Sequence, residues 1–100
     1  MSTHTSITNV RIPEHVVSRG FGSETVALNL ATGKYHGLNP TAGRMLEVLR
    51  DTPVLDDAAV IVAREFDVSP DRVRRELGQF CAELAERGLV ELNDSPVSRP

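Results

Sequence analysis

The sequence predicts an α+β domain in which β-strands come first and three α-helices follow. In residues 10–38, the short β-branched segment "HVVSR" and the alternating segment "TVALNL" are typical of strands. In residues 39–88, apolar side chains recur every three or four positions, as they do on one face of an amphipathic helix. The chain has 100 residues, of which 40% are hydrophobic, and this is enough for one globular domain with one core.

The polar ends of the chain predict a flexible segment on either side of this domain. Residues 1–9 are rich in serine and threonine, and residues 93–100 are polar and contain proline. The domain itself is predicted to cover residues 10–92. The N-terminus lacks the apolar stretch of a signal peptide, and no apolar run approaches the length of a membrane span. A cytoplasmic protein without a membrane partner is therefore expected.

A β-hairpin is predicted at residues 25–38. The segment "TVALNL" should place its larger apolar residues on one face of a strand: Val26, Leu28 and Leu30. In "ATG", Gly33 fits the positive-φ position of a three-residue loop with a bulge. That loop would pair Leu30 with Lys34, Leu28 with His36 and Val26 with Leu38. A two-residue turn would instead reverse the two faces of the strand.

The predicted helices carry recognisable start and stop signals. The first begins with Asn39 as the cap and Pro40 at the first helical position, and it must stop before Pro53. The second covers about residues 56–66 and starts with two aspartates, which suit the N-terminal end of a helix dipole.

The third helix has the clearest start, with Ser69 as the cap and Pro70 at the first position, and Gly88 ends it. The apolar faces of the three helices are predicted to supply the core. Their residues are Ala42, Met45, Leu46 and Leu49 in the first helix, Ala59, Val62 and Phe66 in the second, and Val73, Leu77, Phe80 and Leu84 in the third. The segment "LVEL" after Gly88 should either add a short strand or pack onto the core.

No set of residues predicts catalysis, a metal or a cofactor. His4, His15 and His36 lie in three different settings, namely the N-terminal tail, the start of a strand and the hairpin. Cys81, the single cysteine, lies beside the apolar stripe of the third helix and is expected to be a small buried hydrophobic residue. No spacing fits a metal site, and the glycines form no phosphate-binding loop. A protein without enzymatic activity is therefore expected.

A winged-helix DNA-binding regulator is the main alternative from another class. Helices followed by "ERGLVEL" are typical of winged-helix proteins, and "DRVRRE" brings Arg72, Arg74 and Arg75 into the first turns of the third helix. However, acidic neighbours balance these arginines, and the formal net charge is −3. A phosphate-binding surface needs several cations on one face, so no nucleic-acid partner is predicted.

Peptide recognition is the function that the hairpin and the third helix favour. The strand Lys34–Leu38 is predicted to lie at a sheet edge, where free backbone groups can pair with an extended peptide. Beside the core stripe of the third helix lies a row of mostly small residues: Arg74, Gly78, Cys81 and Ala85. Such a row leaves room either for close helix packing or for the side chains of a ligand, and the sequence leaves both interpretations open.

The run "VALNLATGKYHGLNPTAGRMLEVL" resembles the PqqD-type fold, the leader-binding element of pathways for ribosomally made, post-translationally modified peptides. The similarity lies in a strand, a Thr-Gly hairpin, an aromatic residue on the next strand and "LNPTA" at the start of a helix. The later "FCAELAERGLVEL" is similar to the end of the family's third helix. The resemblance covers about residues 10–92. It implies a winged-helix-like fold, with a three-stranded antiparallel sheet followed by three α-helices.

The resemblance also implies a binding site. Family members bind the leader segment of a precursor peptide, which here would add as a strand beside Lys34–Leu38 and lie against residues 70–85. The residues expected to bind the leader are Val26, Leu28, Lys34, Tyr35, His36, Gly37 and Leu38 of the hairpin, and Arg74, Arg75, Leu77, Gly78, Cys81 and Ala85 of the third helix. An apolar wall is expected from Val26, Leu28, Leu38, Leu77 and Cys81. Arg74, with Arg75 beside it, is expected to meet an acidic leader residue, whereas Arg72 should point to solvent.

More than one pathway uses such a domain as a separate chain. The tight hairpin and the short chain resemble the stand-alone leader-binding protein of lasso-peptide biosynthesis, which works beside a separate leader peptidase. Pyrroloquinoline quinone biosynthesis also has a free-standing version, which serves a different modifying enzyme. The resemblance therefore implies an adaptor that presents a precursor peptide to a processing enzyme, with a leader peptidase as the favoured partner.

Overall fold

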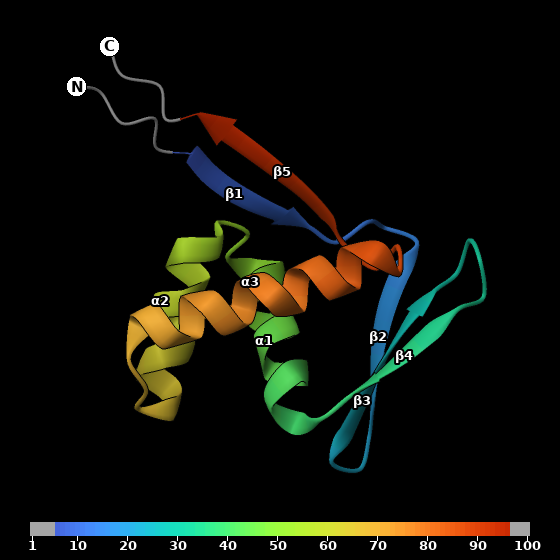
Figure 1. The fold of residues 1–100 in the computed structure, drawn as a ribbon. Coiled ribbons are helices and arrows are strands. Elements are labelled where there is room, and N and C mark those ends of the chain that lie inside the picture. The colour runs from blue at the N-terminus through green and yellow to red at the C-terminus, as the bar shows by residue number, and fades with distance from the viewer. Residues whose placement is uncertain (1–5, 97–100) are drawn as a thin grey trace.

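The computed structural model describes residues 6–96. Its elements, in chain order, are β1 (Ser6–Arg11), β2 (Val16–Phe21), β3 (Glu24–Asn29), β4 (Tyr35–Leu38), α1 (Pro40–Asp51), α2 (Leu55–Phe66), α3 (Pro70–Glu86) and β5 (Glu91–Pro96) (Figure 1). Strands β2, β3 and β4 form an antiparallel sheet in that order, and the three helices follow, which confirms the predicted fold class. None of the helices in residues 6–96 has the length and apolar character needed to span a membrane.

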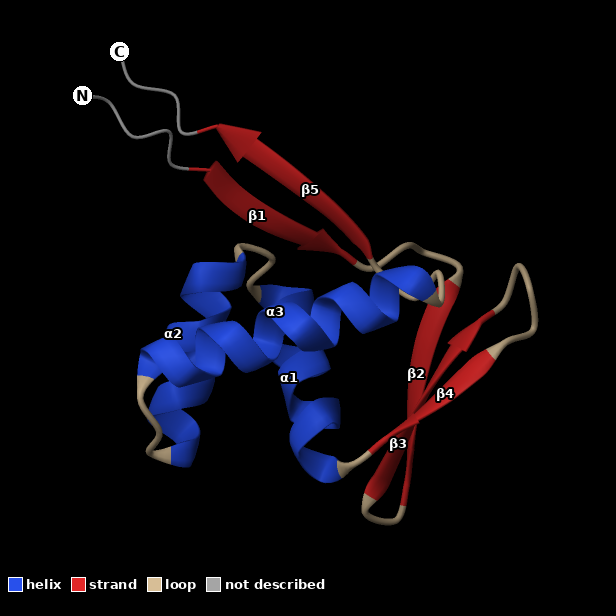
Figure 2. Cartoon of the chain, viewed as in Figure 1, coloured by secondary structure: helices blue, strands red, loops and turns tan. Residues whose placement is uncertain are grey.

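A second, two-stranded sheet pairs β1 with β5 and lies apart from the three-stranded sheet (Figure 2). It is attached to the helices because the Val10 amide donates to the Pro53 carbonyl at 2.8 Å. The two strands include residues 6–9 and 93–96, which the sequence had assigned to the tails. The remainder of the predicted tails, residues 1–5 and 97–100, lies outside the described residues.

The helix boundaries follow the capping signals of the sequence. The Asn39 side chain accepts a hydrogen bond from the Ala42 amide at 2.8 Å, and the Ser69 hydroxyl accepts one from the Arg72 amide at 3.4 Å. The chain after α3 turns at Gly88, whose φ of 73° lies in the left-handed region that favours glycine. The starts of the first and third helices are therefore confirmed.

The core lies between the helices and the inner face of the three-stranded sheet. Most of the predicted apolar positions are buried in it: Met45, Leu46, Leu49, Ala59, Val62, Val73, Leu77 and Leu84. Ala42 and Phe80 are partly buried and pack against this core. Phe66, however, was predicted to point inward and is 42% exposed. It is the last residue of α2, beyond the part of the helix that other elements cover.

The register of the β3–β4 hairpin differs from the predicted register by one residue. The structure pairs Leu28 with Tyr35, Ala27 with His36 and Val26 with Gly37. This shift reverses the two faces of β3, so that Ala27 is fully buried while Val26 and Leu28 share the outer face with Tyr35. The loop has four residues rather than three, but Gly33 has the predicted positive φ, at 77°.

Asn29 accounts for this register. Its side-chain oxygen accepts hydrogen bonds from the amides of Ala31 at 2.9 Å and Thr32 at 3.2 Å, which builds the turn. Its side-chain nitrogen donates to the Gly88 carbonyl at 3.0 Å. The backbone N–H of Asn29 donates to the Lys34 carbonyl at 2.8 Å and closes the loop. Asn29 can make the bond to Gly88 only from the inner face of β3. Because side chains alternate along a strand, this position determines which face every other residue of β3 occupies.

Helix α1 packs against β3 and β4, and Gly43 makes the contact with β3 close. A Cβ atom at Gly43 would lie 2.7 Å from the Thr25 hydroxyl oxygen. By contrast, a Cβ atom at Gly78 in α3 would meet nothing within 4 Å. Two helical glycines therefore differ in the space around them.

We expect Gly43→Ala to destabilise the protein by about 1–3 kcal/mol, because the methyl group overpacks the contact with Thr25. We expect the matched control Gly78→Ala to stabilise it by about 1 kcal/mol, because alanine is the better helix former and fits without a clash. Denaturant unfolding of both variants measures the two free energies. Equal stabilisation by both substitutions would contradict the described packing of α1 on β3.

Candidate functional site

Strand β4 presents an open edge. Because Asn29 and Lys34 form a hydrogen-bonded pair, the alternation of an antiparallel ladder directs the N–H and C=O groups of Tyr35 and Gly37 away from β3. β4 is the last strand of its sheet, and no other strand within residues 6–96 pairs with it. Two free donors and two free acceptors therefore lie along this edge, with the spacing that an added strand requires.

A cleft adjoins this edge where the hairpin loop approaches the end of α3. It has a volume of about 500 Å³, and its lining residues are Gly33, Lys34, Tyr35, Glu86, Arg87 and Leu89. Phe80 and Glu83 lie on the same flank of α3 as Arg87, because residues three or four positions apart share one side of a helix. Lys34 and Arg87 bring two cations to this end of the cleft, and Glu86 brings one carboxylate.

The predicted apolar wall does not form as a single surface. Leu38, Leu77 and Cys81 are buried in the core, each at most 3% exposed. Val26 and Leu28 are half-buried on the outer face of the sheet, whereas His36 shares the inner face with Leu38. The reason is the one-residue shift in register, which places Val26 and Leu28 on the opposite face of the sheet from Leu38.

Of the hairpin residues predicted to form the site, the structure brings Lys34, Tyr35 and Gly37 to the open edge of β4 and its cleft. It does not bring Arg74 there. Arg74 lies beside Asp56, Ala59 and Val60 of α2, around a small hollow on that side of α3. Gly78 and Ala85 share this side of the helix with Arg74 and are half-buried. Glu86 and Arg87, which line the cleft, were missed because the helical periodicity of a sequence does not show which residues of a helix approach the sheet.

The arginines at the start of α3 are largely paired within their own helix. Arg72 forms an ion pair with Glu76 at 3.0 Å, and the closest atoms of Arg74 and Asp71 are 3.6 Å apart. Arg75 is exposed. Pairing with carboxylates reduces the positive charge that this surface offers to a phosphate backbone.

The polar groups of the described residues show no arrangement for a metal or a nucleophile. Within residues 6–96, no cluster of three or more histidine, cysteine, aspartate or glutamate side chains could hold a metal ion. Burial raises the pKa of the Cys81 thiol from its ordinary value of 9.0 to about 12, which keeps the thiol protonated and unreactive at neutral pH. His15 is exposed and His36 is half-buried, while His4 lies outside the described residues.

The outer face of the three-stranded sheet is apolar, although no other element within residues 6–96 packs on it. Cross-strand pairing places five apolar side chains there, beside the charged Arg19 and Glu24: Val17, Phe21, Val26, Leu28 and Tyr35. Phe21 is 66% exposed and Tyr35 is 71% exposed. The solvent face of an antiparallel sheet is usually polar, so this surface, which we call the outer sheet face, is a candidate contact for another molecule.

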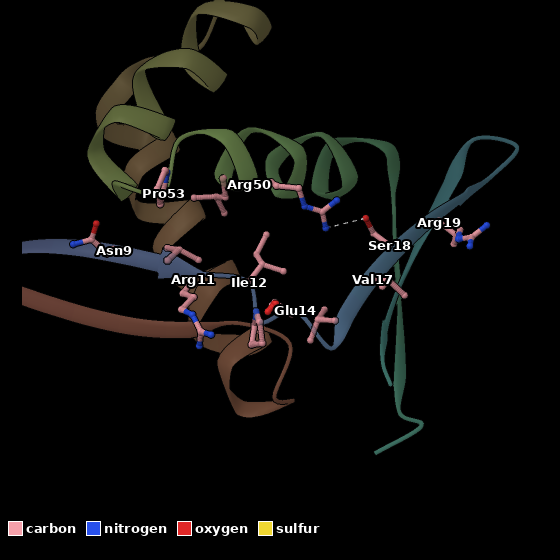
Figure 3. A pocket seen from close by; sticks show the side chains of 13 residues that line it. Asn9, Arg11, Ile12, Glu14, Val17, Ser18, Arg19, Arg50 and Pro53 are labelled. Carbon is pink, nitrogen blue, oxygen red and sulfur yellow. Dashed lines mark hydrogen bonds between the residues drawn. The ribbon is translucent and has the colours of Figure 1, made fainter. Parts of the chain in front are cut away.

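A second cleft lies at the opposite edge of the same sheet, beside β2 (Figure 3). It has a volume of about 690 Å³ and is bounded by the segment from Asn9 to Glu14, by β2 and by the end of α1. The Arg50 guanidinium of α1 donates to the Ser18 hydroxyl of β2 at 3.3 Å across it. The two edges of the sheet therefore have a cleft each.

The match to known proteins agrees with this geometry. Residues 24–90 match the model of the family described as coenzyme PQQ synthesis protein D (PqqD). The chain belongs to the PqqD family. The matched residues of this PqqD-family domain run from the start of β3 to the end of the segment after α3, and they include the open edge and the cleft beside it.

Two solved structures are similar to this PqqD-family domain. One is TbiB1 in complex with the TbiA(beta) leader peptide, which is 31% identical with a TM-score of 0.73 over 81% of this chain and 94% of that chain. The other is a lasso peptide synthetase B1 complexed with the leader peptide, which is 23% identical with a TM-score of 0.72 over 83% of this chain and 98% of that chain. The second similarity shows the fold alone. No curated protein sequence matches the chain.

The raised pKa of Cys81 predicts how stability depends on pH. In the folded protein the thiol stays protonated up to about 12, whereas in the unfolded chain it ionises near 9.0. The stability that this difference contributes is present below the lower value and is lost as the pH rises through the upper one. We expect the free energy of unfolding to fall from about pH 8 to about pH 11, and to fall less in Cys81→Ala. Urea unfolding of both proteins at the two pH values measures this, and equal slopes would contradict it.

Proposed function

We propose that this PqqD-family domain binds the leader segment of a ribosomally made precursor peptide by strand addition to β4. The observation that carries this proposal is the open edge of β4, where the backbone groups of Tyr35 and Gly37 point outward. Main-chain hydrogen bonds from such an edge hold an extended peptide of almost any sequence, and neighbouring pockets then select its side chains. The complex of TbiB1 with the TbiA(beta) leader peptide supports the proposal, because TbiB1 shares 31% of its sequence with this chain.

The cleft between the hairpin loop and α3 is the proposed place where leader side chains are selected. A strand added to β4 runs past Lys34 and Tyr35 at one end of this cleft. Its side chains on the α3 side would meet the flank with Phe80, Glu83 and Arg87, which replaces the earlier expectation of contacts to Arg74. Lys34 and Arg87 favour an acidic leader residue at the loop end, in an exposed pairing worth about 0–1 kcal/mol.

We further propose that the domain acts as an adaptor and delivers the bound leader to a separate processing enzyme, with a leader peptidase as the favoured candidate. The enzyme is proposed to dock on the outer sheet face, because this apolar surface is continuous with the strand that holds the leader. Tyr35 belongs to both: its backbone lies at the open edge and its side chain on the outer sheet face. Holding the leader beside the docked enzyme raises the effective concentration of the substrate.

The first test removes one outward backbone donor. Gly37→Pro deletes an N–H group that points away from β3, so the sheet keeps its internal bonds and an added strand loses one. We expect leader binding to weaken by about tenfold, and the matched control Gly37→Ala, which keeps the N–H group, to bind normally. Isothermal titration with the TbiA(beta) leader peptide, which the 31% identical TbiB1 binds, measures both affinities.

Circular dichroism must first show that Gly37→Pro is folded. Normal leader binding by the folded proline variant would then contradict strand addition at β4. Binding of duplex DNA in place of the leader, with an affinity that falls steeply with salt, would contradict the function as a whole.

The second test separates docking of the enzyme from capture of the leader. Phe21→Glu places a charge in the exposed apolar surface, and we expect it to weaken binding of the peptidase by about tenfold or more. Leader affinity should not change, because Phe21 lies in β2 at the far side of the sheet from β4. Val60→Glu, at an exposed apolar position of α2, is the matched control and should bind both partners normally.

Sedimentation velocity completes the comparison. If the unmodified protein is a dimer that Phe21→Glu converts to a monomer, the outer sheet face joins two copies of the chain and is not the docking site of an enzyme.

A further inference from the structure

The cleft beside β2 combines an apolar floor with a polar rim. Its floor is formed by side chains that are buried or half-buried: Val10, Ile12, Pro13, Val16 and Leu49. Figure 3 shows Ile12 in the centre of the cleft, with Arg50 and Ser18 facing each other across one side of it. A floor of this kind buries the apolar side chains of a ligand, while the rim orients its polar groups.

The backbone of β2 is free along this cleft. The ladder that turns Tyr35 and Gly37 outward at β4 also directs the backbone groups of Val26 and Leu28 toward β2. Their partners are Arg19 and Val17, so the N–H and C=O groups of Ser18 point away from the sheet. Within residues 6–96, no backbone hydrogen bond uses them. β1 does not cover this edge, because it pairs with β5.

Arginines outnumber carboxylates along the rim of the cleft. Three arginines and one glutamate line the cleft: Arg11, Arg19, Arg50 and Glu14. Arg11 forms an ion pair with Glu91 of β5. Within residues 6–96 neither Arg19 nor Arg50 forms an ion pair, and the Arg50 guanidinium donates a hydrogen bond to the Ser18 hydroxyl. This edge is therefore cationic in a protein whose formal net charge is −3.

We propose that the β2 cleft binds an extended segment of a partner protein in which apolar and acidic residues alternate. The segment adds as a strand to the free edge of β2 and pairs with the backbone of Ser18. Its apolar side chains lie on the inner side of the sheet, on the floor formed by Ile12, Val16 and Leu49, and its carboxylates lie on the outer side, where they meet Arg19. Alternation follows from the period of two in a strand, which sends successive side chains to the floor and to the rim.

This site is distinct from the proposed leader site. β2 and β4 are the two opposite edges of one sheet, with β3 between them, so one extended segment cannot occupy both. The β2 cleft adjoins the outer sheet face at Val17 and Arg19, which lie on that face and also line the cleft. A partner docked on the outer sheet face can therefore reach the β2 edge without displacing a peptide from β4.

The experiment uses the full chain and an acetylated, amidated probe peptide of about eight residues that alternates valine and glutamate. We expect the amide resonances of β2 and of Arg50 to shift in heteronuclear NMR titrations. Replacement of glutamate by lysine in the probe should abolish binding. N-methylation of alternate amides in the probe should also abolish it, because this removes the donors of an added strand and leaves the protein unchanged.

Matched variants locate the site. We expect Arg19→Gln to weaken binding of the probe by about fivefold, whereas Arg64→Gln, an exposed arginine of α2, should leave it unchanged. Ser18→Pro should abolish binding and Ser18→Ala should retain most of it, because only the proline removes the outward N–H group. Gly37→Pro should bind the probe normally, which separates this site from the leader site.

Three results would overturn the proposal: shifts confined to β4 and α3, loss of binding in Gly37→Pro, or equal binding of the N-methylated probe. None of these results depends on whether β4 binds a leader peptide. Concentration-dependent self-association through β2 in the absence of the probe would also overturn it, because the edge would then belong to a second copy of the chain.

Discussion

The side-chain amide of Asn29 fixes the hairpin against the end of α3, and the surface of the sheet follows from this contact. Asn29 is 3% exposed and is the one buried polar side chain among the described residues. Its oxygen holds the turn and its nitrogen holds the Gly88 carbonyl. A buried amide without these partners would cost about 1–3 kcal/mol, so Asn29 must lie on the inner face of β3. Every other residue of β3 is thereby assigned to a face.

Two surfaces depend on that assignment. With Asn29 inward, Ala27 and Thr25 also face inward, and Thr25 is small enough to let α1 approach at Gly43. Val26 and Leu28 then face outward and make the outer sheet face apolar. The same register turns the backbone of Tyr35 away from β3 and leaves the edge of β4 open. The bonds that stabilise the hairpin therefore also determine which groups the sheet offers to other molecules.

The sequence predicted the helices well and the faces of the sheet poorly, for one physical reason. Helix starts are local, because a cap such as Asn39 or Ser69 bonds to an amide three residues later. The faces of β3 are not local. Its larger apolar residues were assigned to the core, but the inner face belongs to a small residue and an amide whose partner is 59 positions away. The surroundings of each flank of α3 are likewise decided by tertiary packing, which places Arg74 beside Ala59 and Val60 of α2.

The edges and the outer face of the sheet are geometrically separate, so the two proposed partners would occupy different surfaces. A strand added to β4 as proposed would take the backbone groups of Tyr35, whereas a protein docked on the outer sheet face would contact the side chain of the same residue. The two proposed contacts use different groups of Tyr35, so neither requires the other to break. Coupling between the two partners can then arise from proximity alone, since a leader held on β4 has a high effective concentration at the docked enzyme. A rigid hairpin would help to hold the leader beside the enzyme, because motion of β4 relative to α3 would move the bound peptide as well. The Asn29 contact restricts that motion by linking the hairpin loop to the carbonyl that follows α3.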